Sequence, residues 1–117
     1  MRRAVSTGFI IASLMAGTII PASASDPIRL TIKDHRFSPD KITVPTGERL
    51  RLEITNQDAT PEEFESSDLR VEKIIVPGGK ITVIVGPLKP RDYKFFGEYH
   101  SDTASGILTA VDPATGN

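Results

Sequence analysis

The sequence predicts an all-β protein, a Greek-key β-sandwich of seven to eight short strands. Through most of the chain after residue 24, apolar residues recur at every second position, which is the period of a half-buried strand. Turn formers, chiefly Pro, Gly, Asn and Asp, separate these runs at intervals of about ten residues. No segment after residue 24 has the apolar spacing of a helix of ordinary length. Short strands separated in this way are typical of β-sandwiches.

Three strands are predicted in the first half of this region. They cover residues 28–32, 41–47 and 48–55, and the turn FSPD at 37–40 separates the first two. Alternation predicts one inward-facing set: Ile28, Leu30, Ile32, Ile42, Val44, Leu50, Leu52 and Ile54.

The middle of the chain is less regular. Residues 56–63 (NQDATPEE) predict a loop, because Asn, Asp and Pro favour turns and Pro cannot donate to a strand ladder. Residues 64–70 predict either a short strand or a single helical turn, with Phe64 in the core. Residues 71–79 and 80–88 predict two strands joined at Pro77-Gly78-Gly79, and Ile81, Val83 and Val85 face inward.

The last two strands are predicted at 93–100 and 105–111, followed by a tail at 112–117. Alternation places Tyr93, Phe95 and Gly97 on one face of the first of these strands. It places Phe96, Glu98 and His100 on the other face, where the strand gives way to a polar loop.

The first 24 residues predict a secretory signal peptide. Arg2 and Arg3 precede an apolar run that ends at Ala22-Ser23-Ala24, a small-residue cleavage site. A membrane anchor is the alternative, but polar residues and glycine dilute the run and no basic stop-transfer residues follow it. We therefore expect a periplasmic protein with one domain at residues 25–117 and no stable membrane insertion after cleavage.

Composition excludes several classes of function. Cleavage after residue 24 leaves 93 residues with 12 basic and 15 acidic side chains, a charge of about −3, so there is no basic surface for nucleic acid. The chain has no cysteine, which removes blue-copper, iron–sulfur and disulfide chemistry. Hydrolase and nucleotide-binding motifs are absent, so nucleophilic catalysis is disfavoured.

Two groups of side chains remain as candidates for chemistry. Glu62 and Glu63 begin an acidic segment that also contains Glu65 and Asp68, and Glu98 and His100 lie in GEYHSD. A solvated acidic edge is the simpler explanation for any single glutamate. One imidazole with several carboxylates also suits Cu(II), iron, zinc or manganese. His35 lies in a turn and is expected to be an exposed polar residue.

The segments ITVPTGERLRLEITNQD, TPEEFES and GPLKPRDYKFFGEYHSDTASGILTAV together resemble a cupredoxin. Within that superfamily, EEFES, LRVEKIIVPGGK and the following GPLKP resemble the EfeO-type cupredoxin-like domain of bacterial periplasmic iron-uptake proteins. The resemblance covers most of residues 25–117 and implies a Greek-key sandwich with a metal site at one end.

The family's ligand pattern is a His after a loop Pro, then Cys, His and Met near the last hairpin. On this chain the resemblance places Glu62 at the first His, Gly97 at the Cys and His100 at the second His. The Met position falls on Ala104 or Ser105. Glycine has no thiolate, so a blue-copper site is excluded. The resemblance instead implies a metal site of His100 and Glu62, completed by Glu98 and Glu63.

The function implied by this resemblance is that of a periplasmic metal-binding protein that takes copper, as Cu(II), or iron. It would assist iron uptake by metal binding, delivery or redox handover to a membrane iron permease or another periplasmic uptake component. Two alternatives stay open. One is a non-metal protein-interaction module, and the other is a copper-dependent ferroxidase component, for which the sequence gives no independent sign.

Overall fold

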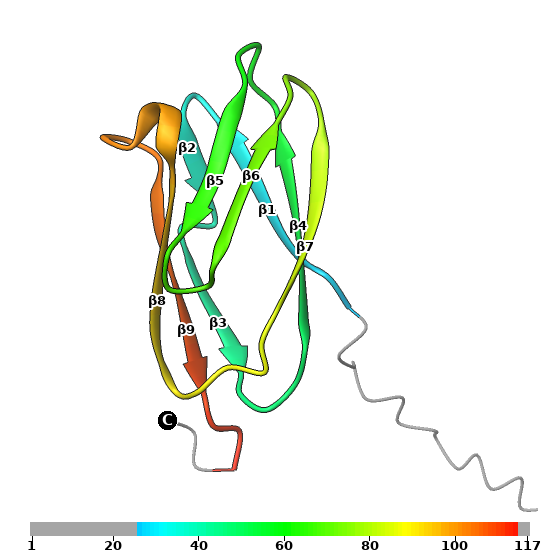
Figure 1. Cartoon of the computed structure of the whole chain (residues 1–117), viewed down its shortest axis with the longest axis vertical. Coiled ribbons are helices and arrows are strands. Elements are labelled where there is room, and N and C mark those ends of the chain that lie inside the picture. The colour runs from blue at the N-terminus through cyan, green and yellow to red at the C-terminus, as the bar shows by residue number, and fades with distance from the viewer. Residues whose placement is uncertain (1–25, 115–117) are drawn as a thin grey trace, which may run out of the picture.

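The computed structural model describes residues 26–114, which form a β-sandwich of two mixed sheets (Figure 1). The predicted signal peptide lies outside the described residues. Nine strands and one 3-10 turn make up this region: β1 (Ile28–Lys33), β2 (Arg36–Ser38), β3 (Lys41–Pro45), β4 (Leu50–Asn56), β5 (Glu62–Ser66), β6 (Val71–Ile75), β7 (Lys80–Val85), β8 (Arg91–Gly97), η1 (Glu98–His100) and β9 (Ser105–Val111).

The two sheets contain four and five strands. Their orders are β2-β1-β4-β7 and β3-β9-β8-β5-β6. Strand β1 runs parallel to β4 and β3 runs parallel to β9, whereas the other paired strands are antiparallel. Because four of the seven pairs of neighbouring strands are not consecutive in the chain, this is the Greek-key sandwich that the sequence predicts.

The core between the sheets comes from the alternating residues of the strands, as predicted. Three phenylalanines form its centre, with ring centroids 5.0 Å apart for Phe37 and Phe95, 5.5 Å for Phe64 and Phe95 and 6.0 Å for Phe37 and Phe64. Fully burying a side chain of this size contributes about 1.5–3 kcal/mol. An apolar core of this kind is consistent with a small domain that has no disulfide.

The structure corrects three details of the prediction. The three-residue strand β2 lies where only a turn was predicted, so the described region has nine strands instead of seven to eight. Strand β5 begins at Glu62, inside the predicted loop. Strand β8 ends at Gly97, so alternation does not extend to Glu98 and His100, which belong to η1.

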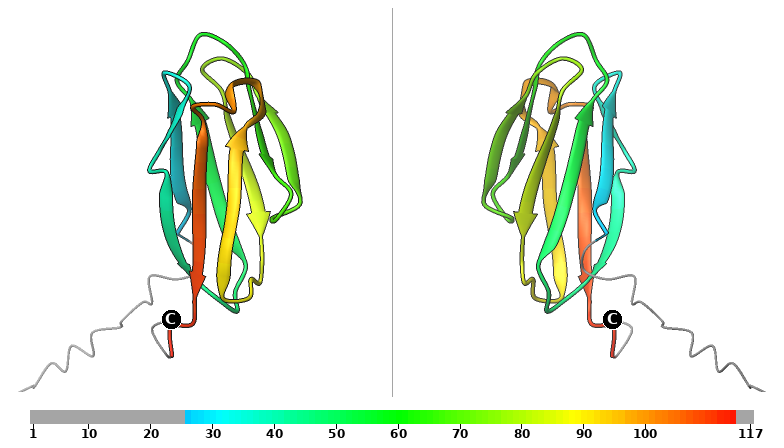
Figure 2. Two further views of the ribbon diagram at one scale, coloured as in Figure 1. Left: turned by 90° about the vertical axis from the view of Figure 1, so that its left-hand side faces the viewer. Right: turned by 90° about the vertical axis from the view of Figure 1, so that its right-hand side faces the viewer.

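One end of the sandwich gathers segments from distant parts of the chain. The turn between β1 and β2 lies beside η1 at the top of Figure 1, and both views of Figure 2 agree. The two segments are joined where Thr103 Oγ1 donates a hydrogen bond of 2.7 Å to the carbonyl oxygen of His35. Within residues 26–114, no helix has the length and apolar character needed to cross a membrane.

Candidate functional site

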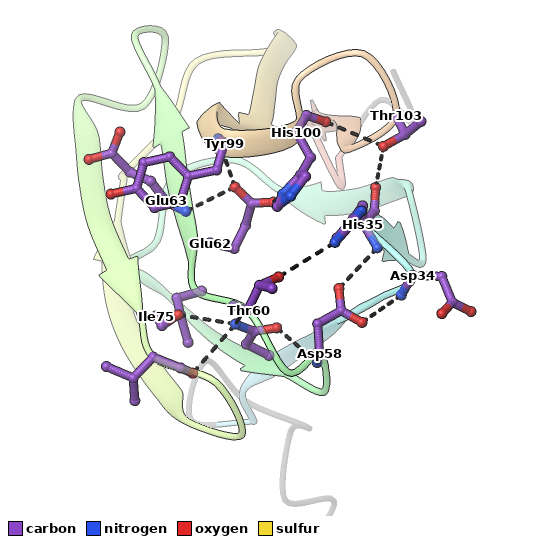
Figure 3. A network of polar contacts seen from close by, with 12 residues as sticks. Asp34, His35, Asp58, Thr60, Glu62, Glu63, Ile75, Tyr99, His100 and Thr103 are labelled. Atoms are coloured by element: carbon purple, nitrogen blue, oxygen red, sulfur yellow. Dashed lines mark hydrogen bonds and ion pairs between the residues drawn. The ribbon is translucent and has the colours of Figure 1, made fainter.

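The site centres on a buried carboxylate. Glu62 is the first residue of β5 and faces inward with Phe64, so only 1% of its surface is exposed. Its Oε1 accepts hydrogen bonds from the backbone N–H groups of Glu63, at 3.0 Å, and Tyr99, at 2.9 Å. Its Oε2 lies 2.7 Å from Nδ1 of His100 (Figure 3). All these contacts satisfy a carboxylate that burial would otherwise destabilise.

The 3-10 turn η1 brings His100 to this carboxylate. After β8 ends, the backbone N–H of Ala104 donates to the carbonyl oxygen of His100 over 2.8 Å, and the N–H of Gly97 donates to the carbonyl oxygen of Ala104 over 2.9 Å. This compact loop turns the imidazole back toward the sandwich, and its side chain keeps 25% exposure. With Oε1 of Glu62 accepting two N–H groups, Nδ1 is assigned as the donor to Oε2.

Gly97 makes room for the carboxylate. Its φ of −91° and ψ of 110° are open to any residue, so its backbone conformation does not explain the glycine. A Cβ added there would lie 2.6 Å from Cδ of Glu62 and 2.9 Å from Cβ of Ala104, closer than real Cβ atoms approach. The Glu62 side chain therefore fills the space beside position 97.

His35 also belongs to the site, which sequence reasoning missed. It lies in the predicted turn but is half-buried, and its ring stacks on that of His100 with centroids 3.5 Å apart and planes 8° from parallel. His35 Nε2 lies 3.5 Å from Oγ1 of Thr60 (Figure 3). No local signal pairs residues 35 and 100, since the contact depends on the strand topology.

A polar network supports the loop below the two rings. Asn56 is fully buried, and its Nδ2 donates to the carbonyl oxygens of Thr60, at 2.9 Å, and Ile75, at 3.1 Å, while its Oδ1 accepts from the N–H of Asp58. Burial by itself would raise the pKa of Asp58. Hydrogen bonds from the backbone N–H groups of His35 and Asp34 outweigh burial and hold that pKa below its usual value.

A second group of carboxylates lies on the outer face of β5 and β6. Glu63, Glu65 and Glu72 each have an oxygen atom within 4.8 Å of the others. Burial first, and then the neighbouring carboxylates of Glu72 and Glu98, raise the pKa of Glu63. The pKa of Glu65 is raised by burial and by Glu98, which also hydrogen-bonds to it. We call the four residues Glu63, Glu65, Glu72 and Glu98 the outer acidic group.

The four predicted site residues therefore fall into two places. His100 and Glu62 meet at the end of the sandwich, as the resemblance implies. Glu63 and Glu98 lie in the outer acidic group, because adjacent residues of a strand face opposite sides and because η1 interrupts the face that Glu98 and His100 were predicted to share.

Comparison with known proteins identifies the family. The model of the cupredoxin-like domain matches residues 6–110. The chain belongs to the cupredoxin-like family. This cupredoxin-like chain is 48% identical over 85 residues to an uncharacterized protein, RP394, of Rickettsia prowazekii (strain Madrid E), and the match covers 73% of this chain and 68% of that protein.

Solved structures share the fold of this cupredoxin-like chain. The metal-binding domain of the Cu(I)-exporting P-type ATPase CopA of Streptococcus pneumoniae D39 has a TM-score of 0.64 at 14% identity, covering 74% of this chain and 85% of that one. A purple cupredoxin of Nitrosopumilus maritimus has a TM-score of 0.56 at 17% identity, covering 72% and 99%. A Cu(I) form of an amicyanin mutant has a TM-score of 0.58 at 12% identity, covering 73% and 82%.

The residues at the end of the sandwich do not fit a copper–thiolate centre. Position 97 has no side chain, and the Glu62 carboxylate lies against it. The side chains of His100 and Glu62 do fit a metal site with one nitrogen ligand and one oxygen ligand. Two donors that each lie about 2.0–2.2 Å from one ion at a right angle are about 3 Å apart, and Nδ1 of His100 and Oε2 of Glu62 are already 2.7 Å apart.

Proposed function

We propose that this cupredoxin-like chain is a periplasmic metal-binding protein that holds Cu(II) or iron between His100 and Glu62. The observation that carries the proposal is the 2.7 Å approach of Nδ1 to Oε2 at a buried position. The donors are supplied by β5 and η1, which are joined by the hydrogen bond from the backbone N–H of Tyr99 to Oε1 of Glu62. Such a pair supplies one nitrogen and one oxygen ligand without rearrangement of the backbone.

The donor types favour the oxidised ions. Imidazole and carboxylate are harder ligands than thiolate and thioether, so they suit Cu(II) and ferric iron better than Cu(I). A bound ion would supply Lewis acidity and, for copper or iron, access to one-electron chemistry. We therefore place metal binding and delivery ahead of electron carrying in the proposed role.

The proposed role in iron uptake rests on the sequence. EEFES, the following LRVEKIIVPGGK and GPLKP resemble the EfeO-type domain, and residues 1–24 have the features of a signal peptide. The partner would be a membrane iron permease or another uptake component in the periplasm. In the described region, the donor pair lies at one end of the sandwich, and His100 is partly exposed there.

Metal titration tests the proposal. Purified protein is titrated with Cu(II) and with ferric iron, and binding is followed by calorimetry and electron paramagnetic resonance. His100→Ala is expected to weaken Cu(II) binding by more than about tenfold, since even residues outside the ligand set contribute that much. Glu72→Gln, in the outer acidic group, is the matched control and is expected to leave the affinity unchanged.

Two results would count against the proposal. Equal Cu(II) binding by His100→Ala and wild type would show that the ion lies elsewhere, and loss of binding in Glu72→Gln would move it to the outer acidic group. Oxygen consumption on addition of ferrous iron, dependent on loading with copper, would assign the ferroxidase role instead.

An interaction module is the second candidate function. Ile74 and Tyr99 are 54% and 47% exposed, and Ile74 pairs directly with Glu63 in the outer acidic group. Among the described residues, no Lys or Arg forms an ion pair with these four glutamates. Charge complementarity makes a basic protein surface the matching partner. Absence of Cu(II) and ferric iron binding would favour this function over the first.

A further inference from the structure

The turn that carries His35 has a left-handed backbone at two residues that are not glycine. Lys33 pairs with Arg36 in the β1–β2 hairpin, so Asp34 and His35 form a two-residue loop. Both have positive φ, 52° for Asp34 and 58° for His35. Two-residue hairpin loops with this backbone favour Gly at the second position, because side chains at positive φ are strained. The chain keeps an imidazole at a position where glycine would be less strained.

Contacts from two other segments hold this turn. The Asp58 carboxylate accepts the N–H of Asp34 at 2.7 Å and the N–H of His35 at 2.9 Å. On the other side, Thr103 donates its hydroxyl to the carbonyl oxygen of His35 at 2.7 Å. Thr103 belongs to the loop after η1, and its N–H donates to the carbonyl oxygen of His100 at 3.1 Å. These contacts fix the backbone of residue 35 relative to that of residue 100.

The result is that His100 is held on its edge and on its face. Glu62 fixes the Nδ1 edge, and the His35 ring covers one face at 3.5 Å (Figure 3). Ring nitrogens bind an ion in the plane of the imidazole. Because the two planes are nearly parallel, His35 and His100 cannot both direct a nitrogen at the same ion in this arrangement.

We propose that His35 is a positioning residue, which keeps the His100 imidazole turned with Nδ1 toward Glu62. A backbone strained at a residue that another segment holds in place is a recurrent feature of functional sites. Asp58 and Thr103 supply that restraint here. The orientation itself follows from these contacts alone, whereas its consequence for metal affinity rests on the proposed function.

Two substitutions of His35 separate the ring from the turn. His35→Gly suits the positive φ and removes the ring, so the variant is expected to keep the hairpin. His35→Phe keeps a flat ring over His100 but has no nitrogen. Both are checked for folding by the dispersion of their backbone amide signals in NMR spectra.

The first measurement needs no metal. Exchange with water of the proton on His100 Nδ1 is followed by NMR in wild type and both variants. In His35→Gly it is expected to accelerate by about tenfold or more, because the ring is freed to leave Glu62, and His35→Phe is expected to restore slow exchange. Wild-type exchange in a folded His35→Gly variant would overturn the proposal.

The second measurement uses Cu(II) alone. His35→Gly is expected to bind it more weakly, by about tenfold, and His35→Phe to recover wild-type affinity and the wild-type paramagnetic resonance spectrum. A spectrum that loses one nitrogen coupling in both variants would make His35 a ligand and overturn the positioning role. If the wild type binds neither Cu(II) nor ferric iron, the proposed function fails, and the exchange measurement still decides the role of His35.

Discussion

The two faces of strand β5 give glutamate side chains opposite environments. Glu62 points inward, where each of its oxygens has a hydrogen-bond donor at 2.7–3.0 Å. Glu63 and Glu65 point outward into the outer acidic group, where burial first and then the neighbouring carboxylates raise the pKa values of both. The inner carboxylate is buried and fully partnered, and the outer ones are accessible and mutually repelled.

The difference shows that the roles of these glutamates are set by their burial and their hydrogen-bond partners, since the residue type is the same on both faces. A metal ion at the inner position would replace the proton that Nδ1 of His100 donates to Oε2 of Glu62, so only an ion that binds both nitrogen and oxygen ligands is favoured there. The outer face needs only positive charge nearby.

The largest effect is expected from Glu62→Ala. It leaves the N–H groups of Glu63 and Tyr99 and the Nδ1 of His100 without their partner, and breaking a buried pair of this kind costs about 3–5 kcal/mol. Chemical denaturation should show this loss in the free energy of unfolding. Glu63→Ala, one residue along the same strand, is the control and should leave stability unchanged or slightly higher. Equal losses in the two variants would contradict the contrast between the faces.

Gly97→Ala should have the next largest effect. The new methyl group would overlap Cδ of Glu62 and Cβ of Ala104, and overpacking of this kind costs about 1–3 kcal/mol. Denaturation measures the loss, and a crystal structure should show the Glu62 carboxylate displaced from His100. Gly47→Ala is a useful comparison: nothing lies within 4 Å of the added Cβ, although φ of 83° strains the backbone. An unmoved carboxylate in Gly97→Ala would show that the close approach is unimportant.

A smaller loss is expected from Asp58→Asn. The amide keeps one oxygen acceptor but not the charge that receives the N–H groups of Asp34 and His35, and a hydrogen bond of this kind contributes about 1–2 kcal/mol. Because folding lowers the pKa of Asp58 below 3.8, its contribution is present above that pH and is lost as the pH falls through the folded value. The stability difference between Asp58→Asn and wild type should therefore shrink in strong acid. A difference that does not change with pH would exclude this origin.

The smallest effect, and of opposite sign, is expected from Glu65→Gln. Folding raises the pKa of Glu65 above 4.5, so its ionised form disfavours the folded state at neutral pH. The variant should unfold at a slightly higher denaturant concentration than wild type at pH about 7. This advantage should disappear at a pH below 4.5, where the wild-type side chain is protonated. High salt should also reduce the stability advantage of the variant. A variant less stable than wild type at neutral pH would show that other contacts already compensate the repulsion within the outer acidic group.

Strand alternation predicted the core because every second residue of a strand faces the same side. The buried Tyr93, Phe95 and Gly97 follow it directly, as do Glu62 and Phe64. The prediction failed where the backbone leaves the extended conformation. His100 reaches Glu62 through η1, and no alternation pattern encodes that turn.

The pairing of His35 with His100 could not be predicted from local sequence. The two residues are 65 positions apart, and their stacking follows from the parallel and antiparallel order of β1, β2, β8 and β9. The backbone of Asp34 and His35, at positive φ without glycine, gives no sequence signal either. The resemblance to cupredoxins placed Glu62 and His100 together at one end of the sandwich, and the structure brings these two side chains into contact, but the family's ligand pattern does not include residue 35.

The hydrogen bond from Thr103 to His35 spans 68 positions of the chain, and the contact of Glu62 with His100 spans 38. Contacts of such high sequence separation form only after the intervening segments have been ordered, which makes their folding slow. A nascent chain that ends before η1 has neither the imidazole at residue 100 nor the loop after η1 that holds residue 35. The cluster therefore forms only when η1 and the loop after it pack against β5 and the β1–β2 turn, and a polypeptide truncated before η1 cannot present it to solvent ions.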